Sequence, residues 1–175
     1  MRIYLILFIQ TAEKMKQFNE TQRFTQWWLW LILLGSWVLM MSALATEPPQ
    51  TTISFIFSFG LGMLLPLLFW QMKLTTRITQ EGIYVRFFPF HFKERFYPWD
   101  SISASYVRTY SPLLEYGGWG IKYSFKGNGL VYNTAGNVGL QLNFKEGDPV
   151  LIGTQKGEEI KAVLAELGRL TESMK

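Results

Sequence analysis

Two long, uninterrupted apolar stretches dominate the pattern of hydrophobic and polar positions along this chain. They run from Trp27 to Ala45 and from Ile53 to Met72, and neither contains a charged residue. About 20 apolar residues in a helix are long enough to cross a hydrocarbon core of about 30 Å. Inside lipid each backbone group must be bonded within its own segment, which predicts a helix for each stretch. The polar connection, residues 46–52, is so short that the two helices should form an antiparallel hairpin.

From Lys73 onward, short alternating runs replace the continuous apolar pattern. Runs rich in β-branched and aromatic residues, bounded by Gly, Asn and Asp, are typical of strands joined by tight turns. The turn at residues 80–82 predicts a hairpin between the first two runs, 74–79 and 83–88. Further strands are expected at residues 94–99, 102–109, 120–125, 129–133, 138–144 and 149–154.

The last segment returns to a helical period. Glu158 and Glu159 suit the first turn of a helix, where the backbone dipole is positive, and Thr154 or Gln155 is expected to cap it. One apolar stripe on a helix needs a sheet to cover, so the domain should be a small β-barrel or β-sandwich closed by this helix. The stripe has spacings of three and four and consists of Ile160, Val163, Leu164, Leu167 and Leu170.

Four segments carry a likeness to a known family: Phe18-Asn19-Glu20-Thr21-Gln22-Arg23-Phe24, Tyr116-Gly117-Gly118-Trp119-Gly120-Ile121, Tyr132-Asn133-Thr134-Ala135-Gly136-Asn137 and Leu151-Ile152-Gly153-Thr154-Gln155. Over residues 15–175 the chain resembles small bacterial membrane proteins that have two spans followed by a pleckstrin-homology-like domain. The resemblance implies an α-helical transmembrane hairpin followed by an α+β domain, a β-barrel or β-sandwich of pleckstrin-homology-like type with a C-terminal capping helix. It implies a place in the bacterial inner membrane, and no activity or functional residue.

Basic residues flank both apolar stretches on the same side of the expected membrane. Three bases precede the first stretch and three follow the second, whereas the connection at 46–52 has no base: Lys14, Lys16 and Arg23, and then Lys73, Arg77 and Arg86. Because Lys and Arg collect on the cytoplasmic side, both termini are expected in the cytoplasm and the connection outside. The protein should therefore be a multi-pass protein of the cell membrane.

Three regions follow from this topology. Residues 1–26 form a cytoplasmic N-terminal segment, 27–72 the transmembrane hairpin and 73–175 the cytoplasmic domain. The part from Phe18 to Gln26 is expected to lie along the membrane interface or to pack against the domain. Residues 1–14 are expected to be an interfacial or poorly ordered extension, with Met15 as an alternative first residue.

The composition argues against several kinds of function. The chain has no cysteine and one histidine, His91, so thiolate metal sites and imidazole pairs are excluded. Ionisable residues inside a membrane span usually mark a transport path, and neither apolar stretch contains one. A transporter or channel that acts alone is therefore not expected. Asp100, Glu115 and His91 are the only acid–base groups near turns, and no serine has the sequence context of a nucleophile elbow. We therefore expect no enzyme activity, cofactor or metal; the net charge of +4, interrupted by acids, also argues against a nucleic-acid partner.

The segment from Tyr116 to Gly120 is the most unusual local sequence. Three glycines around Trp119 indicate backbone conformations that other residues avoid. In one interpretation Trp119 folds inward and plugs one end of the domain. In the other, Trp119 and Tyr116 are exposed aromatic side chains that contact a partner chain or the membrane interface.

The segment from Tyr132 to Gly139 has a superficial likeness to a phosphate-binding loop. It lacks the Lys-Ser/Thr pair and opens no helix, so a tight hairpin turn explains its Asn and Gly residues better. Asn133 and Asn137 remain candidates to offer their amides to a peptide or a lipid headgroup.

Arg86, Lys93 and Arg95 are the candidate basic contacts to lipid. Six bases and three acids lie between Lys73 and Arg108, an excess of three in the part of the domain nearest the second apolar stretch. Each base near an anionic surface contributes about 1 kcal/mol of attraction. The simpler explanation, positive-inside flanking, accounts fully for the bases that directly follow the stretch.

Together these features predict a non-enzymatic integral membrane protein that presents a cytoplasmic module for protein interaction or scaffolding. Its expected partners are the lipid bilayer and another protein. Gly60 and Gly62 permit close helix packing, which leaves a homo-oligomer open. Two alternatives also stay open: a module that senses anionic lipid, and an accessory subunit of a transport or membrane-enzyme complex.

Overall fold

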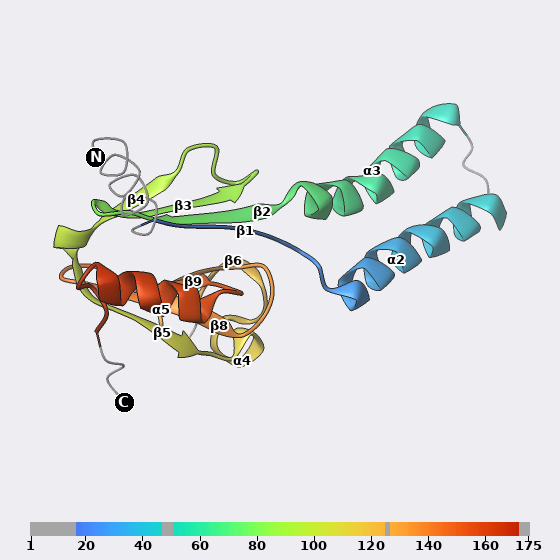
Figure 1. Ribbon diagram of the computed structural model, residues 1–175. Helices are drawn as coiled ribbons and strands as arrows, with labels where there is room; N and C mark the ends of the chain where they lie inside the picture. The colour runs from blue at the N-terminus through green and yellow to red at the C-terminus, as the bar shows by residue number, and fades with distance from the viewer. Residues whose placement is uncertain (1–16, 47–50, 125–126, 172–175) are drawn as a thin grey trace, which may run out of the picture. The chain divides into compact units, whose positions relative to one another are not determined.

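The computed structural model describes residues 17–46, 51–124 and 127–171 (Figure 1). The chain folds into two compact units. The helical unit is Phe24–Met72, and the sheet domain combines residues 17–23 with the described residues from Lys73 onward. The expectations for residues 1–14 and for most of the connection at 46–52 lie outside the described residues.

The helical unit consists of α2 (Trp27–Thr46) and α3 (Thr52–Gln71). The helices pack together through aromatic and small residues: the Trp37 and Phe59 rings meet edge-to-face at 5.9 Å. At Gly62 the end of the flexible Met40 side chain and the Trp37 ring lie close to the backbone of α3, so side chains of α2 fill the space that a Cβ would take. The apolar hairpin is therefore present in the structure.

The described residues contain fewer candidate membrane spans than the sequence predicts. Among the described residues, α2 is the one helix that is long and apolar enough to cross a membrane. The corresponding apolar part of α3, Phe55–Gln71, is shorter. By length and composition the structure therefore has one candidate span where the sequence predicts two.

Four strands form the first sheet, sheet A: β1 (Phe18–Arg23), β2 (Lys73–Ile78), β3 (Gly82–Phe88) and β4 (Arg95–Pro98). They are antiparallel in the order β1-β2-β3-β4. The pairing of β1 with β2 runs from Phe18 opposite Ile78 to Arg23 opposite Lys73. The helical unit is thus inserted between two neighbouring strands. Of the two positions that the sequence allowed for the segment before α2, residues 18–23 lie in the domain's own sheet.

Five strands form the second sheet, sheet B: β5 (Ile102–Thr109), β6 (Gly120–Tyr123), β7 (Leu130–Asn133), β8 (Val138–Phe144) and β9 (Val150–Gly153). Their order is β5-β8-β9-β7-β6, and β7 pairs with β9 in parallel. The expected strands are therefore confirmed within a few residues. The barrel is not: the described strands form two separate sheets, because no strand of sheet A pairs with one of sheet B.

The C-terminal helix α5 (Gly157–Glu166) contacts β1, β5 and β8, so it lies against the edge strands of both sheets (Figure 1). Ile160 and Leu164 of its apolar stripe are fully buried. The helix is shorter than predicted, because Gly168 adopts a φ of 66° just beyond its end. The cap was also predicted wrongly: the N-cap residue is Lys156, and Thr154 bonds elsewhere.

The core lies between the two sheets. Alternate residues of β2 and β3 face inward from sheet A, and residues of β8 and β9 face them from sheet B. The rings of Tyr97 and Phe144 contact across the sheets at 5.4 Å. The fully buried apolar side chains include Leu74, Ile78, Ile83, Val85, Phe87, Leu140, Leu142 and Ile152.

Two of the three inward side chains of β1 are polar and bind sheet B by hydrogen bonds, while the third, Phe18, belongs to the buried core. Glu20, 6% exposed, accepts from the Thr154 hydroxyl at 2.6 Å and from the Gln155 backbone N–H at 2.9 Å. Gln22 donates its amide to the Gly153 carbonyl at 2.7 Å. Buried polar groups stabilise a fold only when they are paired, and these pairs hold β1 against the end of β9.

We expect Glu20→Ala to lower the free energy of unfolding of the full-length protein by about 1–3 kcal/mol, because the buried Thr154 hydroxyl and the part-buried Gln155 N–H lose their acceptor. Asn19→Ala is the matched control, since Asn19 is the exposed neighbour on the same strand. Denaturant titration in detergent, followed by circular dichroism of the sheets, measures both. Equal stability of the two variants would contradict the structural role of Glu20.

Candidate functional site

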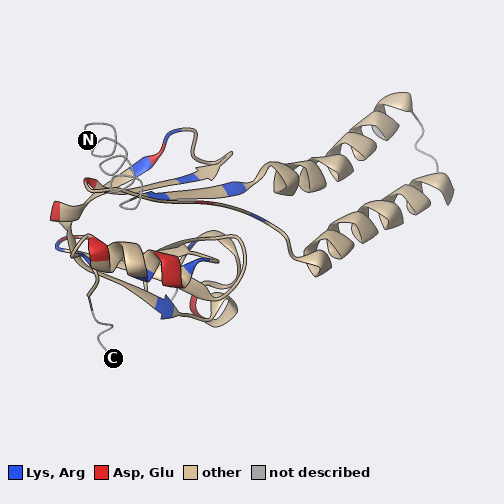
Figure 2. Cartoon of the chain, viewed as in Figure 1, with Lys and Arg blue, Asp and Glu red and all other residues tan. Residues whose placement is uncertain are grey.

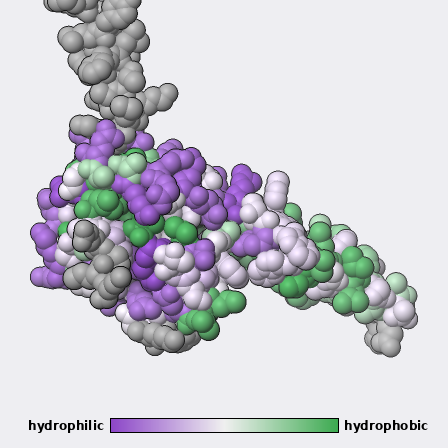
Figure 3. Space-filling model, turned by 60° about the horizontal axis from the view of Figure 1, so that its bottom comes forward, coloured by the Kyte–Doolittle hydropathy of each residue, from purple (hydrophilic) through white to green (hydrophobic). Residues whose placement is uncertain are grey.

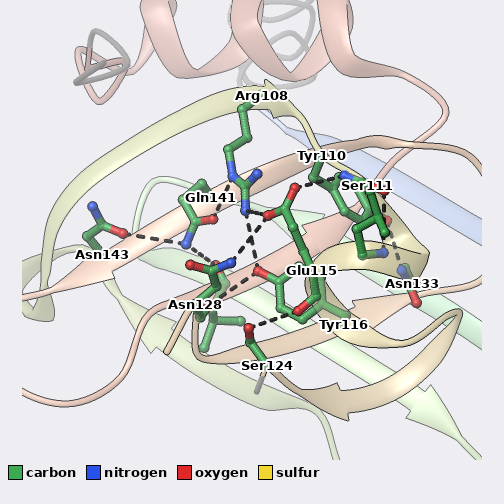
Figure 4. Close-up of polar contacts among 12 residues, drawn as sticks. Arg108, Tyr110, Ser111, Glu115, Tyr116, Ser124, Asn128, Asn133, Gln141 and Asn143 are labelled. Atoms are coloured by element: carbon green, nitrogen blue, oxygen red, sulfur yellow. Dashed lines mark hydrogen bonds and ion pairs between the residues drawn. The ribbon is translucent and has the colours of Figure 1, made fainter. Parts of the chain in front are cut away.

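A polar hollow lies on the face of sheet B that α4 (Pro112–Tyr116) partly covers (Figure 4). Tyr106 and Arg108 are two positions apart on β5, and Gln141 and Asn143 are two positions apart on β8, so each pair points to one face of the sheet. Tyr106 lies directly opposite Gln141 in the sheet, so these side chains share one face. The hollow has a volume of about 250 Å³, and its lining is completed by Glu115, Gly127, Asn128 and Pro149.

An ion pair occupies the centre of the hollow. The Arg108 guanidinium donates to Glu115 Oε2 at 2.8 Å and to Gln141 Oε1 at 3.0 Å (Figure 4). Both side chains of the pair are 22% exposed. Burial alone would lower the pKa of Arg108, but the hydrogen bond and the charge of Glu115 outweigh it and raise this pKa. The guanidinium therefore stays charged.

The carboxylate of Glu115 has further donors around it. Its Oε1 accepts from the backbone N–H of Ser111 at 2.8 Å, and the Asn128 amide lies 3.5 Å from Oε2. Arg108, Glu115, Gln141 and Asn128 thus bond to one another across the hollow. A connected network of this kind fixes the geometry of a polar surface.

The short helix α4 is fixed at both ends. Ser111 caps it by accepting from the Leu114 N–H, and Gly117 ends it in the left-handed conformation with a φ of 71°. Tyr116 is 1% exposed and packs in a small apolar cluster with Tyr110. Burial raises the pKa of Tyr110 to about 12, so its hydroxyl stays neutral at physiological pH.

The aromatic residues singled out in the sequence have different environments. Tyr116 is buried, and its hydroxyl donates to the Asn128 carbonyl at 3.2 Å. Trp119 is half-buried, and its indole N–H donates to the Gly136 carbonyl at 3.2 Å. Neither ring lies free on the surface, although Trp119 keeps part of its surface exposed.

The two asparagines also separate. Asn133 is fully buried: its amide donates to the Tyr110 hydroxyl at 2.9 Å, and its oxygen accepts from the Gly120 N–H at 2.8 Å. Asn137 is exposed, and its backbone carbonyl accepts from the Tyr110 N–H at 2.8 Å. Asn133 therefore orders loops inside the domain, whereas the Asn137 side chain faces solvent.

The three basic candidates belong to sheet A and lie apart from the hollow. Arg86 is half-buried on β3, opposite Thr75, while Lys93 and Arg95 are exposed in and after the β3–β4 connection. Partial burial and then the charge of Arg95 hold the pKa of His91 below its usual range. The imidazole in this connection is thus neutral near pH 7.

Sequence reasoning missed the hollow, although it noted Glu115 as an acid near a turn. Arg108 and Gln141 fall at regular positions of their strands, but nothing local shows that β5 pairs with β8. Asn128 reaches the same place from the turn before β7. Within residues 17–46, 51–124 and 127–171, no group of three or more His, Cys, Asp or Glu side chains could hold a metal ion.

No protein-family model, curated protein or solved structure matches the chain. The fold and the hollow define a class by themselves: an α+β domain of two sheets with an apolar helical hairpin inserted between its first two strands. The pleckstrin-homology-like assignment goes beyond this class and remains part of the proposal below.

We expect Asn133→Ala to destabilise the domain by about 1–3 kcal/mol, because the Gly120 N–H and the Tyr110 hydroxyl lose a buried partner. Asn137→Ala should change the free energy of unfolding by less than about 0.5 kcal/mol, as is usual for exposed positions. Thermal and denaturant unfolding of the two full-length variants checks this difference. If Asn137→Ala were the more destabilising change, the structural role of Asn133 would be wrong, and Asn133 would again be a candidate to contact a partner.

Proposed function

We propose that this protein is a two-span integral membrane protein whose sheet domain, of pleckstrin-homology-like type, binds a partner protein at the cytoplasmic face. In this proposal it acts as a scaffold without catalysis of its own. The observation that carries the proposal is a pair of exposed leucines on α4, beside the polar hollow.

Membrane insertion is supported by the outer surface of the helical unit. Its large apolar side chains are exposed over both helices; Leu39 is 71% and Phe57 70% exposed. Figure 2 shows no charged residue along α2 or α3, and Figure 3 shows hydrophobic side chains gathered along this unit. A continuous apolar surface of this kind needs lipid or another chain to cover it.

Attachment at two neighbouring strands supports a scaffold at the membrane. The chain leaves sheet A at Arg23 for the helical unit and re-enters it at Lys73, the residue opposite. The domain is therefore joined covalently to the helical unit at two neighbouring residues. If the helices insert in the membrane, this attachment keeps a bound partner close to the bilayer and raises its effective concentration there.

The partner surface in this proposal is centred on α4. Leu113 is 64% and Leu114 75% exposed, although both belong to a helix whose other residues are anchored by Pro112 and Tyr116. Apolar side chains on a rigid element with a polar rim are typical of the core of a protein interface. The rim is supplied by Glu115 and Arg108 in the hollow.

The test is purification of the full-length protein from its native membranes in mild detergent, with quantitative mass spectrometry of co-eluting proteins. We expect a stoichiometric partner whose yield falls at least tenfold in the double variant Leu113→Glu, Leu114→Glu, about 1.4 kcal/mol of binding free energy. Leu170→Glu is the matched control, because Leu170 is an exposed leucine of the same domain.

Two results would overturn the proposal. If no protein co-elutes with the wild type, the scaffold function is wrong. If a partner co-elutes equally with all three proteins, the α4 surface is not the binding site. Equal unfolding temperatures of the variants and the wild type exclude misfolding as the cause of a loss.

A further inference from the structure

The register of sheet A identifies which of its ends is joined to the helical unit. Arg23 lies opposite Lys73, and Lys73 lies opposite Phe88, so these three residues form the last row of the sheet. β2 begins at Lys73, two positions after α3 ends at Gln71. The β3–β4 connection, which follows Phe88, therefore starts at the same end of the sheet at which the apolar helices are attached.

This connection exposes aromatic rings to solvent. Phe90 is 56% and Phe92 78% exposed, so two large apolar rings lie two residues apart in one exposed segment. Gathered exposed apolar side chains are more informative than single ones. Phe92 meets the Phe88 ring edge-to-face at 6.0 Å, and the Phe90 ring lies 6.2 Å from that of Phe87. Each of the two exposed rings thus packs against the ring of a phenylalanine at the end of β3.

Basic side chains lie in the same segment and in the last row of sheet A. Lys93 and Arg95 are exposed shortly after Phe92 in the chain, and Arg23 is exposed on β1, which β2 separates from β3. The Lys73 ammonium lies 5.7 Å from the centroid of the Phe88 ring. Aromatic rings with adjacent Lys and Arg are the composition of segments that enter the interface of anionic membranes.

The nearby acid does not cancel this charge. Glu94 forms an ion pair with Arg77 at 2.8 Å, so its carboxylate already has a partner on β2. Lys73, Lys93, Arg95 and Arg23 have no ion pair among the salt bridges of the described residues. A cationic surface beside exposed phenylalanines complements lipid phosphates and the acyl-chain boundary beneath them.

We propose that the segment Phe90–Arg95 is a third membrane attachment, in which Phe90 and Phe92 insert into the headgroup region of an anionic bilayer. Lys93, Arg95, Arg23 and Lys73 then contact the lipid phosphates. This inference rests on the proposed membrane insertion of α2, because that insertion brings this end of sheet A to the bilayer. A lipid surface fits better than a protein partner because the charge and the tethered end of the sheet coincide.

The chain has no cysteine, so a single introduced cysteine carries a spin label at one known position. The full-length protein is placed in bilayer discs of mixed anionic and zwitterionic lipid, and the accessibility of each label to oxygen and to a water-soluble nickel complex is measured. Oxygen concentrates in lipid and nickel in water. The labelled positions are Phe92→Cys, Leu39→Cys in α2 and Asp148→Cys in the exposed β8–β9 turn.

We expect the label at Phe92→Cys to favour oxygen, as the label in α2 does, and the label at Asp148→Cys to favour nickel. If the Phe92 label behaves like the Asp148 label while the Leu39 label stays in lipid, the third attachment is wrong and the membrane anchor stands. If the Leu39 label is open to nickel, the anchor itself fails. Protection from both reagents at Phe92 indicates protein contact and overturns the lipid assignment.

A second label removes the concern that Phe92→Cys alters the segment under test. With the label at Lys93→Cys, the added changes Phe90→Ser and Phe92→Ser should lower the ratio of oxygen to nickel accessibility several-fold. Phe96→Ser is the matched control, since Phe96 is an exposed phenylalanine that stacks on Tyr84 in the same sheet. Purely zwitterionic discs should lower the ratio in the unsubstituted segment, and an unchanged ratio there would contradict the role of the bases.

Discussion

The pairing of β1 with β2 is the constraint on which the rest of the molecule depends. It joins chain from before and after the helical unit into one sheet, with Arg23 opposite Lys73 at the boundary. Because the two strands are neighbours, the helices must begin and end at adjacent points. The hairpin geometry of α2 and α3 and their covalent attachment at neighbouring residues of sheet A are both consequences of this one ladder of hydrogen bonds.

The pairing alone does not make β1 part of the core. Two of its three inward side chains, Glu20 and Gln22, are polar, and they are stabilised by donors and acceptors at the end of β9 and beyond. These bonds join the two sheets at one edge, where α5 also contacts β1 and β5. The same side chains that weaken the apolar pattern of β1 therefore specify where β1 lies.

Local patterns in the sequence predict the elements well and their arrangement poorly. Alternation and turn residues give β2, β3, β5 and β8 nearly to the residue, since each depends on neighbours in the chain. The pattern does not predict β1 as a strand, because Glu20 and Gln22 occupy inward positions at which an alternating strand pattern requires apolar residues. The order of sheet B, its parallel pair and the Arg108–Gln141 contact depend on pairings between distant segments, which no local pattern records. The prediction of a closed barrel is wrong for the same reason, because pairing between strands of sheet A and sheet B also depends on distant segments.

The insertion of the helices between β1 and β2 also orders events in time during synthesis. β1 emerges from the ribosome first, yet its partner strand exists only after the whole of Phe24–Met72 has been made. Packing of α2 on α3 brings the two strands together and so reduces the loop-closure entropy that their pairing must overcome. Sheet A is therefore completed after the hairpin has formed. In a chain whose hairpin has not formed, the edge of β2 stays unpaired and can pair with another chain.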